Sequence, residues 1–481
     1  MNLKIKKAEI TMFLKNLALR LVSSQYMLKP EQKLQEKYDT KDIYKTFLKV
    51  AWPAMLESVL ISLVGFIDSI MVSTVGDIAI AEVGLTNQPR MIFYALFFAL
   101  NVGVTAIVSR RFGEKNKQGA NDCLAQALGI CIVFGIIMCV TALTFSEPLL
   151  RFAGAKDDTI GGAKSYFDIT IIGLLFTSIG MVINASQRGC GNTKISMRTN
   201  ITANLVNIVF NFLLINGIGF FPKLGVTGAA IATLMGNVVS CGMSIFSISR
   251  KNSFLYLKIR ELFRLHPQYI KLILKISSSA AAEQLFVRLG FFFYSKIVAE
   301  LGTQAFTTHQ ICMNIIGMSF AVGDGLGVAA SSLVGQNLGK KRPDYSIIYG
   351  KTGQRVGVFI SAFMFVLFSA GGRTLMGLFT KNPDIINAGA LLLIIVAFSS
   401  PAQIYQVIFG GCLRGAGDTR YVAITSFISI ALVRPILTFI ICFPMGYGLI
   451  GAWISLLIDQ YMRFMFSWIR FRNGKWCKIV V

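Results

Sequence analysis

Residues 48–76 have the sequence LKVAWPAMLESVLISLVGFIDSIMVSTVG, an apolar run long enough to cross a membrane as a helix. The chain contains a second copy: residues 274–302, LKISSSAAAEQLFVRLGFFFYSKIVAELG, align on it without a gap, and nine of the 29 positions are identical. The two copies are 226 residues apart. An internal repeat of this kind predicts a fold built from two copies of one unit.

Other segments follow the same repeat. The turn Arg188-Gly-Cys-Gly-Asn-Thr193 matches Arg414-Gly-Ala-Gly-Asp-Thr419 at the offset of 226, and so does Gly113 with Gly339. Near the end of each half, Gly225-Val-Thr-Gly228 matches Gly448-Leu-Ile-Gly451 at an offset of 223. Separated anchors that keep one spacing are hard to obtain by chance, so both halves are predicted to share one topology.

Apolar runs of about 20 residues, the length of a membrane-spanning helix, occur throughout the chain. We expect twelve such spans, near 50–75, 88–112, 122–145, 165–187, 197–217, 226–249, 272–300, 312–336, 352–371, 385–412, 421–443 and 448–470. Six spans per half, an even number, relate the halves by an axis along the membrane normal, which is a parallel repeat. The predicted fold class is therefore an all-α integral membrane protein with twelve transmembrane helices in two six-helix lobes.

Composition supports this class. Only 15% of the residues are charged, 54% are hydrophobic and the mean hydropathy is +0.62, whereas soluble domains are about 25% charged. The net charge of +24 would indicate a nucleic-acid partner in a soluble protein. Here the basic residues lie in short loops between apolar runs, so we expect the lipid bilayer as the partner and no nucleic acid.

The loops on the two sides differ in charge. Taking the first span to start inside, the inner loops hold twenty-one Lys and Arg and the outer loops hold six. Because cytoplasmic loops of membrane proteins are enriched in Lys and Arg, both termini are predicted to be cytoplasmic and the protein to lie in the cell (inner or plasma) membrane.

The predicted domain boundaries follow from the spans. Residues 10–22 are apolar but are interrupted by Lys15 and Arg20 and precede no small-residue cleavage site, so no signal peptide is expected. They are predicted to lie on the membrane surface or to belong to a disordered tail. The expected domains are a basic cytoplasmic extension at 1–45, a six-helix lobe at 46–255, a cytoplasmic linker at 256–271, a second six-helix lobe at 272–472 and a cytoplasmic tail at 473–481.

Several site classes are not expected. The nine cysteines are scattered without a C-x-x-C motif, and His266 and His309 have no partner at ligand spacing, so neither a disulfide framework nor a structural metal is predicted. Gly323-Asp-Gly-Leu-Gly327 lies within a span and follows no strand, which argues against dinucleotide binding. No Walker motif is present, so direct use of ATP is not expected, and no cofactor is predicted. A membrane-embedded enzyme would need a His/Asp or Cys-based cluster in a span or at its mouth. Only one of the two histidines lies near a span, so the chain is not predicted to be an enzyme.

A series of motifs occurs in one order along the chain. They are Pro53 with Phe66-Ile-Asp-Ser69, Gly103-Val-Thr-Ala-Ile-Val-Ser-Arg-Arg-Phe-Gly113, the paired RGxGxT turns, Leu224-Gly-Val-Thr-Gly-Ala-Ala230, His309-Gln310 and Leu333-Val-Gly-Gln-Asn-Leu-Gly339. With these motifs the chain resembles the multidrug and toxic compound extrusion (MATE) family from about residue 45 to 475. The resemblance implies a V-shaped pair of six-helix lobes around a central cavity. It also implies export of amphipathic, often cationic, organic molecules against inward flow of Na⁺ or H⁺.

Two carboxylates lie in the first span. Ionisable groups inside a span cost about 2.5 to 3.5 kcal/mol on insertion scales, so Glu57 and Asp68 are functional candidates. They are eleven residues apart, which places them on one helix face about 16 Å from each other along the axis. That face is expected to look into an aqueous cavity. Asp68 matches the family's acidic residue in span 1, which implies cation coupling; the alternative is a structural hydrogen-bonding acid.

Glu57 has an acidic mate in the second half, Glu283, at the offset of 226. A carboxylate at the same place in both halves indicates that the two acids face each other across the interface, where they would bind a cationic substrate or share a proton. The alternative is that each braces a kinked helix start near the inner membrane surface. The mate of Asp68 is Tyr294, so the coupling site is predicted to be asymmetric and to lie in the N-terminal half.

Asn207 and Asn211 lie one helical turn apart in the fifth span and match a polar pair of the MATE family. Their carbonyl oxygens suit a hard cation such as Na⁺, although Asn also joins membrane helices through neutral hydrogen bonds. Asp68, Asn207 and Asn211 are the predicted site of cation or proton coupling, with Na⁺ as a candidate ligand and no other metal.

The chain departs from some MATE relatives in its second half. A glutamate in span 7 and an aspartate in span 10 of those relatives fall at Val287 and Gln403, so the choice of coupling ion stays open. Span 7 contains Arg288 and Lys296 instead. Arg288 is predicted to pair with Glu283, Glu57 or Asp68, or to contact an anionic substrate.

Two charged features lie in the last spans. Arg434-Pro435 predicts a kink beside a buried or interfacial cation. Asp459 and Arg463 are four residues apart on one helix, the spacing of an internal ion pair.

The sequence thus predicts a monomeric secondary-active antiporter that exports amphipathic organic compounds in exchange for Na⁺ or H⁺. The alternative function is a flippase of lipid-linked saccharides, whose anionic pyrophosphate would suit Arg288, Lys296 and Arg434. The predicted substrate cavity is lined by Glu57, Glu283, Arg288, Gln88 and Gln310.

Overall fold

The apolar runs of the sequence form long helices joined by short turns. The computed structural model describes residues 23–35, 37–219, 221–250, 253–257, 259–262 and 264–481. The helices of the first half are α2 (Thr40–Ser73), α3 (Asp77–Gly113), α4 (Lys117–Thr144), the short α5 (Ser146–Phe152), α6 (Ile160–Gly189), α7 (Thr193–Asn216) and α8 (Gly225–Ile248).

The second half follows the short helix α9 (Ile259–Leu262) and repeats the order of the first. Its fifth segment is interrupted, because α14 and α15 are joined by a π-helical turn, η3. The segments are α10 (Pro267–Ala299), α11 (Thr303–Gly339), α12 (Pro343–Gly377), α13 (Pro383–Gly415), α14 (Thr419–Ser426), η3 (Phe427–Val433), α15 (Arg434–Cys442) and α16 (Gly448–Arg472).

Within the described residues, ten helical segments are long and apolar enough to cross a membrane. The helices α10 and α16 are of similar length but contain charged side chains, Arg288 and Lys296 in α10 and Asp459 and Arg463 in α16. All regular structure in the described ranges is helical. Helices of this number, length and composition indicate a multi-pass membrane protein.

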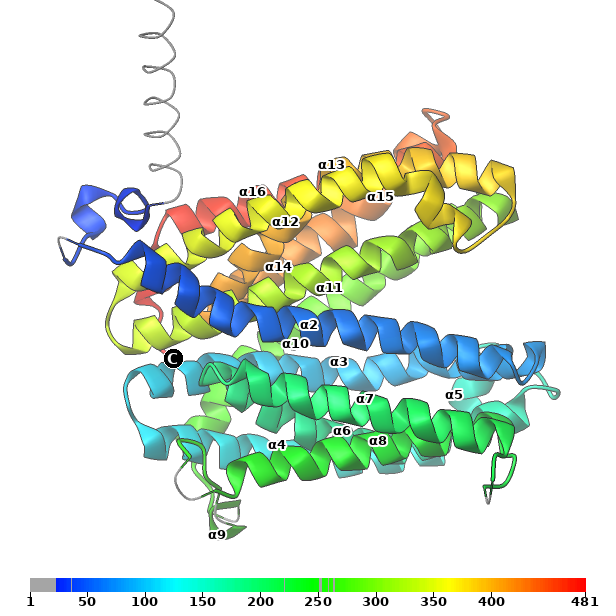
Figure 1. Ribbon diagram of the computed structural model, residues 1–481, viewed down its shortest axis with the longest axis horizontal. Helices are drawn as coiled ribbons and strands as arrows, with labels where there is room; N and C mark the ends of the chain where they lie inside the picture. Colours follow the sequence, from blue (N-terminus) through cyan, green and yellow to red (C-terminus); the bar gives the residue numbers. More distant parts are fainter. Residues whose placement is uncertain (1–22, 36, 220, 251–252, 258, 263) are drawn as a thin grey trace, which may run out of the picture.

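The first helix of each half packs against both halves. α2 packs on α7 of its own half and on α11 of the other, while α10 packs on α14 of its own half and on α3 of the other. Figure 1 shows the result: α3 to α8 lie on one side of α2, and α11 to α16 lie on the other. The internal repeat of the sequence therefore reappears as equivalent helix packing.

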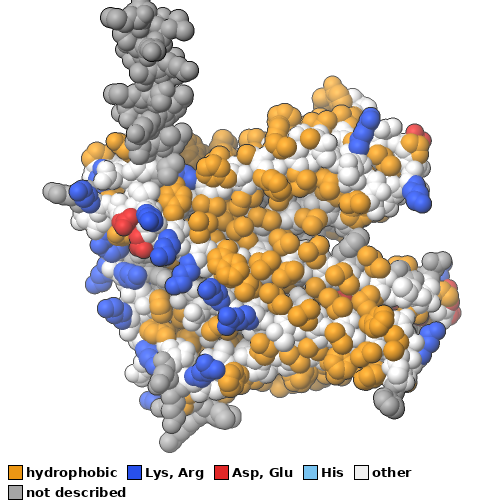
Figure 2. Space-filling view, in the orientation of Figure 1, with side chains coloured by type: hydrophobic (Ala, Val, Ile, Leu, Met, Phe, Trp, Pro, Cys, Tyr) orange, Lys and Arg blue, Asp and Glu red, His pale blue; other side chains and the backbone are white. Residues whose placement is uncertain are grey.

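Paired glycines bring the halves together at one end. Gly113 at the end of α3 lies against the backbone of Gln336, and its repeat mate Gly339 at the end of α11 lies against the backbone of Arg110. A Cβ at either glycine would overlap the facing backbone. We call this contact the closed end. Lys and Arg gather at this end in Figure 2, and the molecule is notched between the halves at the opposite end.

Segments outside the long helices also pack on the closed end. Lys351 of α12 donates to the Met27 carbonyl at 2.5 Å, and the Tyr38 hydroxyl donates to Asp344 at 2.9 Å. The described part of the extension, residues 23–35 and 37–39, is therefore packed on the closed end and does not form a disordered tail; residues 10–22 lie outside the described residues. α2 begins at Thr40, earlier than the predicted boundary at 46, because the Asp39 carboxylate caps it by accepting from the Lys41 and Asp42 amides.

The segment after α16 joins the two halves. Trp476, in the short helix η4 (Lys475–Lys478), is fully buried and donates to the Phe471 carbonyl at 2.9 Å. Farther along, the Ile479 carbonyl accepts from Arg110 of α3 at 2.6 Å. The predicted tail at 473–481 is thus a packed part of the closed end.

Candidate functional site

The predicted coupling residues meet inside the first half. The Asn211 side-chain amide of α7 donates to Asp68 Oδ1 of α2 at 2.8 Å. With the Asn207 amide oriented to satisfy its neighbours, its nitrogen donates to the same oxygen at 2.9 Å and its oxygen accepts from Thr233 Oγ1 at 3.2 Å. We call Asp68, Asn207, Asn211 and Thr233 the Asp68 cluster.

The Asp68 cluster offers oxygen ligands in a largely enclosed place. Asn207 and Asn211 are buried, and Asn211 Oδ1 has no hydrogen-bond partner among the described residues. A buried acceptor without a partner is costly unless another group satisfies it. The Asp68 carboxylate and this amide oxygen are the hard donors that Na⁺ prefers, and Asp68 alone can accept a proton. The arrangement can therefore hold a small cation or a proton.

A cation near Asp68 was missed by the sequence reasoning. Arg90 of α3 acts electrostatically on the Asp68 carboxylate, donates to the Tyr166 hydroxyl at 3.3 Å and lies 5.6 Å from the centre of that ring. The signal was present, because Arg90 is an ionisable residue inside an apolar run. Arg90 thus adds a fixed positive charge that acts on the predicted coupling acid, Asp68.

Glu57 and Glu283 are engaged within their own halves. Glu57 accepts from Asn200 at 2.6 Å and Ser196 at 2.8 Å, and it lies 3.4 Å from Arg188. Glu283 pairs with Arg414 at 2.5 Å. Both acids therefore bind the arginine that opens the RGxGxT turn of their own half. This arrangement favours the bracing alternative over two acids that face each other.

The RGxGxT turns fasten the first helix of each half. Gly191 and Gly417 have φ of +81° and +86°, a left-handed conformation that favours glycine and reverses the chain between helices. Directly after them, Thr193 donates to the Val50 carbonyl at 2.9 Å and Thr419 donates to the Ile276 carbonyl at 3.3 Å. The expectation of a tight turn is confirmed, and its arginine and threonine join the turn to α2 or α10.

Glu57→Gln and Glu283→Gln are expected to destabilise the protein without changing which substrates it exports. Each change removes the charged partner of an arginine and weakens a buried hydrogen-bond network, at a cost of about 1 to 3 kcal/mol. Thermal unfolding in detergent checks the stability, and export of a cationic and a neutral dye checks the selectivity. A selective loss of cationic export in a variant that keeps its stability would contradict this assignment.

The other predicted cavity residues, Arg288, Gln88 and Gln310, are at exposed positions. Arg288 is exposed, and its guanidinium lies 3.8 Å from the Met91 sulfur of α3 across the two halves. Glu57 and Glu283 pair with other arginines, and the cation that acts on Asp68 is Arg90. Gln88 of α3 and Gln310 of α11 are both exposed.

The charges of the last spans form a buried cluster. Arg434 and Asp459 are fully buried and bound to each other, and Arg463 lies 3.1 Å from Asp459. The predicted ion pair is confirmed. The π-helical turn η3 ends directly before Arg434-Pro435, where a kink was expected. Because Arg434 forms a buried ion pair with Asp459, its guanidinium is not available to an anionic substrate.

A second acid inside a span was also missed. Asp324 lies in the middle of α11, has an exposed side chain and interacts electrostatically with Arg414. The sequence prediction considered this segment only as a glycine-rich motif within a span and rejected it as a dinucleotide site. Ionisable residues inside a span are functional candidates, and by this rule Asp324 qualifies as well as Asp68 does.

Comparison with known proteins identifies the family of the chain. The MatE family model matches residues 53–213 and again residues 280–440, once in each repeat. "Uncharacterized transporter YisQ" of Bacillus subtilis is 29% identical over 437 residues, covering 90% of this chain and 95% of that protein. "Probable multidrug resistance protein NorM" of Thermotoga maritima is 28% identical over 447 residues, covering 92% of this chain and 96% of that protein.

Solved structures share the fold. One is an "outward-facing conformation of a multidrug resistance MATE family transporter of the MOP superfamily", with a TM-score of 0.84 at 21% identity over 92% of this chain and 100% of that one. Another is a MOP superfamily transporter from Pyrococcus furiosus, with a TM-score of 0.82 at 21% identity over 93% of this chain and 100% of that one. Because the family model matches more than half of the chain, the chain belongs to the MatE family and is a membrane transporter, not an enzyme.

Proposed function

We propose that the chain is a secondary-active antiporter that exports amphipathic, often cationic, organic compounds in exchange for Na⁺ or H⁺. The Asp68 cluster is the observation on which this proposal rests. It combines a carboxylate in a span with two buried amides and an amide oxygen without a partner among the described residues. Relatives named as probable multidrug resistance proteins support the substrate class.

The proposed architecture has twelve transmembrane helices in two six-helix lobes, residues 46–255 and 272–472. The length of α10 and α16 supports counting them with the ten apolar segments. Because Lys and Arg gather at the closed end, we place that end and both termini in the cytoplasm of a cell membrane protein that acts as a monomer. The conformation is then closed inside and notched toward the outside.

The proposed cycle passes through α2. A proton or Na⁺ at Asp68 neutralises the carboxylate, which weakens its attraction for Arg90 and changes its hydrogen bonds to α7. α2 packs on α7 of one half and on α11 of the other, so a change at Asp68 alters a helix shared by both halves. Differential binding of ion and substrate to the two conformations then supplies the coupling.

The proposed substrate site lies between the halves, near the membrane midplane. Gln88 and Gln310 are candidate cavity residues because both are exposed on α3 and α11, helices that pack on each other across the halves. Asp324 joins them as an acid that suits a cationic substrate. Glu57 and Glu283 are assigned to bracing instead, because both are bound to arginines of their own half.

The test is transport of a fluorescent cationic dye by the purified chain in proteoliposomes under an imposed Na⁺ or H⁺ gradient. Dye movement that follows one gradient and stops when that gradient is collapsed is the expected result, and it names the ion. Absence of movement with both gradients, from protein shown to be folded, would contradict a coupled dye exporter.

The flippase alternative is weakened by the same geometry. It needs cations that are free to hold a pyrophosphate, and Arg434 is bound to Asp459 in a fully buried pair. Arg288 and Lys296 are exposed on α10, but they lie eight residues apart, which separates them by about 12 Å along the helix axis and about 80° around it. We therefore do not propose it.

A further inference from the structure

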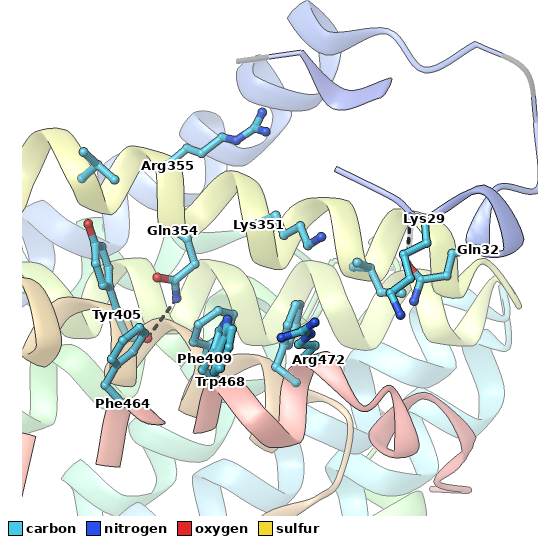
Figure 3. A pocket seen from close by; sticks show the side chains of 13 residues that line it. Lys29, Gln32, Lys351, Gln354, Arg355, Tyr405, Phe409, Phe464, Trp468 and Arg472 are labelled. Atoms are coloured by element: carbon cyan, nitrogen blue, oxygen red, sulfur yellow. Dashed lines mark hydrogen bonds between the residues drawn. The ribbon is translucent and has the colours of Figure 1, made fainter. Parts of the chain in front are cut away.

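A pocket of about 480 Å³ lies on the second half, away from the Asp68 cluster. Its walls come from α12, α13 and α16, and its rim comes from the segment that precedes α2. Figure 3 shows Tyr405 and Phe409 of α13 beside Phe464 and Trp468 of α16, with Lys351 of α12 above them. The volume lies in the range of sites that bind small molecules.

The two ends of this pocket differ in chemistry. Tyr405 and Phe464 lie at one end in Figure 3, Lys29 lies at the other, and Lys351 and Arg472 lie between them. The Gln354 amide donates to the Tyr405 carbonyl at 2.9 Å and joins α12 to α13 along the wall. No Asp or Glu is among the described lining residues. The pocket is thus amphipathic, with an aromatic end and a cationic end.

The cations of the pocket lie close together. No acid is among the described lining residues, and Glu31, 3.7 Å from Lys29, lies outside that lining. Lys351 experiences the positive charges of Arg355, Lys29 and Arg472. Its ammonium donates to a backbone carbonyl, that of Met27, and Arg472 lies 5.3 Å from the centre of the Trp468 ring. Like charges gathered at one place repel each other, so a bound anion would stabilise this arrangement.

The pocket faces outward from the helices. Val358 and Trp468, which line it from α12 and α16, are 47% and 40% exposed, on surfaces that adjoin lipid in a membrane-spanning protein. Lys351 lies eight residues into α12, about 12 Å from the start of the helix. The cations therefore lie toward the closed end and the aromatic side chains toward the membrane interior.

The pocket belongs to one half alone. The repeat mate of Lys351 is Ala125, so the first half lacks this cation. The end of α8 does retain an arginine over an aromatic ring, since Arg250 lies 5.0 Å from the centre of Phe246. Arg250 lies over its ring much as Arg472 lies over Trp468 at 5.3 Å, but Arg250 does not line the pocket, so it provides a matched control.

We propose that this pocket binds an anionic phospholipid. The headgroup phosphate lies among Lys351, Arg472 and Lys29, and an acyl chain follows Phe464, Trp468 and Val358 into the membrane. Basic pockets between transmembrane helices at the cytoplasmic face bind anionic headgroups in this way. The lipid would join the segment before α2 to α12 and α16.

The test measures lipid binding by native mass spectrometry of the full chain in a non-ionic detergent. The probes are dioleoyl-phosphatidylglycerol, dioleoyl-phosphatidylcholine and inorganic phosphate. We expect phosphatidylglycerol to bind saturably with one tight site, and the double variant K351Q/R472Q to bind it at least about tenfold more weakly. The control R250Q/K340Q, which removes two positive charges outside the pocket, should bind like the wild type. Lipid binding is measured without transport, so a failure of this proposal can be distinguished from a failure of the proposed export function.

Three outcomes would overturn the proposal. They are equal binding of phosphatidylcholine, unchanged phosphatidylglycerol binding by K351Q/R472Q, and competition by inorganic phosphate alone at similar concentrations, which would place a free anion in the pocket. If K351Q/R472Q does not fold, Val358→Trp provides the second variant, because it fills the apolar end and leaves every cation in place. Phosphatidylglycerol binding is expected to weaken in that variant, and wild-type binding there would also reject the assignment.

Discussion

Asp68→Asn is expected to abolish gradient-driven export while the protein remains folded and abundant. The Asn side chain is nearly isosteric, and its oxygen can still accept from the Asn211 amide that binds Asp68 at 2.8 Å. It cannot take up a proton or supply a negative charge to Na⁺. Coupling energies between sites are about 1 to 3 kcal/mol, so the dye efflux rate under a gradient should fall at least about tenfold.

Asp168→Asn is the matched control for this variant. It makes the same change in neighbouring α6, where the carboxylate forms a partly exposed ion pair with Lys164 at 2.9 Å. Such pairs contribute little to stability, so export should stay near the wild-type rate. Efflux is measured in proteoliposomes of equal protein content, with size-exclusion chromatography as the check of folding. Export by Asp68→Asn at the wild-type rate would remove Asp68 from the coupling mechanism.

Arg90 adds a positive charge to the proposed coupling mechanism. Its charge acts electrostatically on the Asp68 carboxylate, to which we propose that the transported ion binds. Arg90 contacts Tyr166 through the hydroxyl and the ring of that residue. In the proposed cycle, neutralising Asp68 removes its electrostatic attraction for Arg90 and leaves the contact between Arg90 and Tyr166 in place.

Periodicity and repeat spacing predicted the features that depend on one helix or on equivalence between halves. Glu57 and Asp68 were expected on one face of α2, and both contact one neighbour, α7, through Asn200 and Asn211. These two contacts join residues 143 positions apart, as does the Thr193 contact to Val50. α2 and α7 are thus packed in register along one polar seam.

The same reasoning failed where the answer depended on which helix faces another. The face with Glu57 and Asp68 was expected to look into an aqueous cavity, and it packs on α7 because polar side chains there satisfy the two acids. Glu57 and Glu283 were expected either to face each other or to brace the helix starts. Each is bound by an arginine of a turn 131 residues away in its own half, which favours bracing. Helical periodicity gives the angle of a side chain about its own axis, but not the identity of the neighbour.

Two ionisable residues within spans could have been selected from the sequence by the rule that identified Asp68. Arg90 and Asp324 are ionisable residues inside apolar helices, and the cost of burying charge in lipid selects both. The packed segment at 23–38 is different, because nothing in its composition predicts that Met27 is buried or that Tyr38 binds Asp344. Contacts between distant polar segments require the three-dimensional arrangement.

Gly113→Leu is expected to prevent the closed end from forming. The glycine lies against the backbone of Gln336, so a Cβ would overlap main-chain atoms that no rotamer change can move away. Gly339 makes the equivalent contact with the Arg110 backbone from the other half. The ends of α3 and α11 thus approach this closely at two positions that both lack a side chain. The population of the closed conformation should fall roughly a hundredfold, a shift of about 2.7 kcal/mol.

Spin labels at Lys117 and Lys340, exposed positions on either side of the closed end, report this change as a longer distance in pulsed electron resonance. The partly exposed Cys139 and Cys477 are replaced by Ser in that background. Gly84→Leu is the control, because Gly84 lies on the same helix with no atom within 4 Å of an added Cβ. That variant should keep the short distance.

Gly113→Leu should also stop gradient-driven export, because alternating access requires the closed end to close and reopen. An unchanged distance with normal export would show that the glycine contact does not control the conformation.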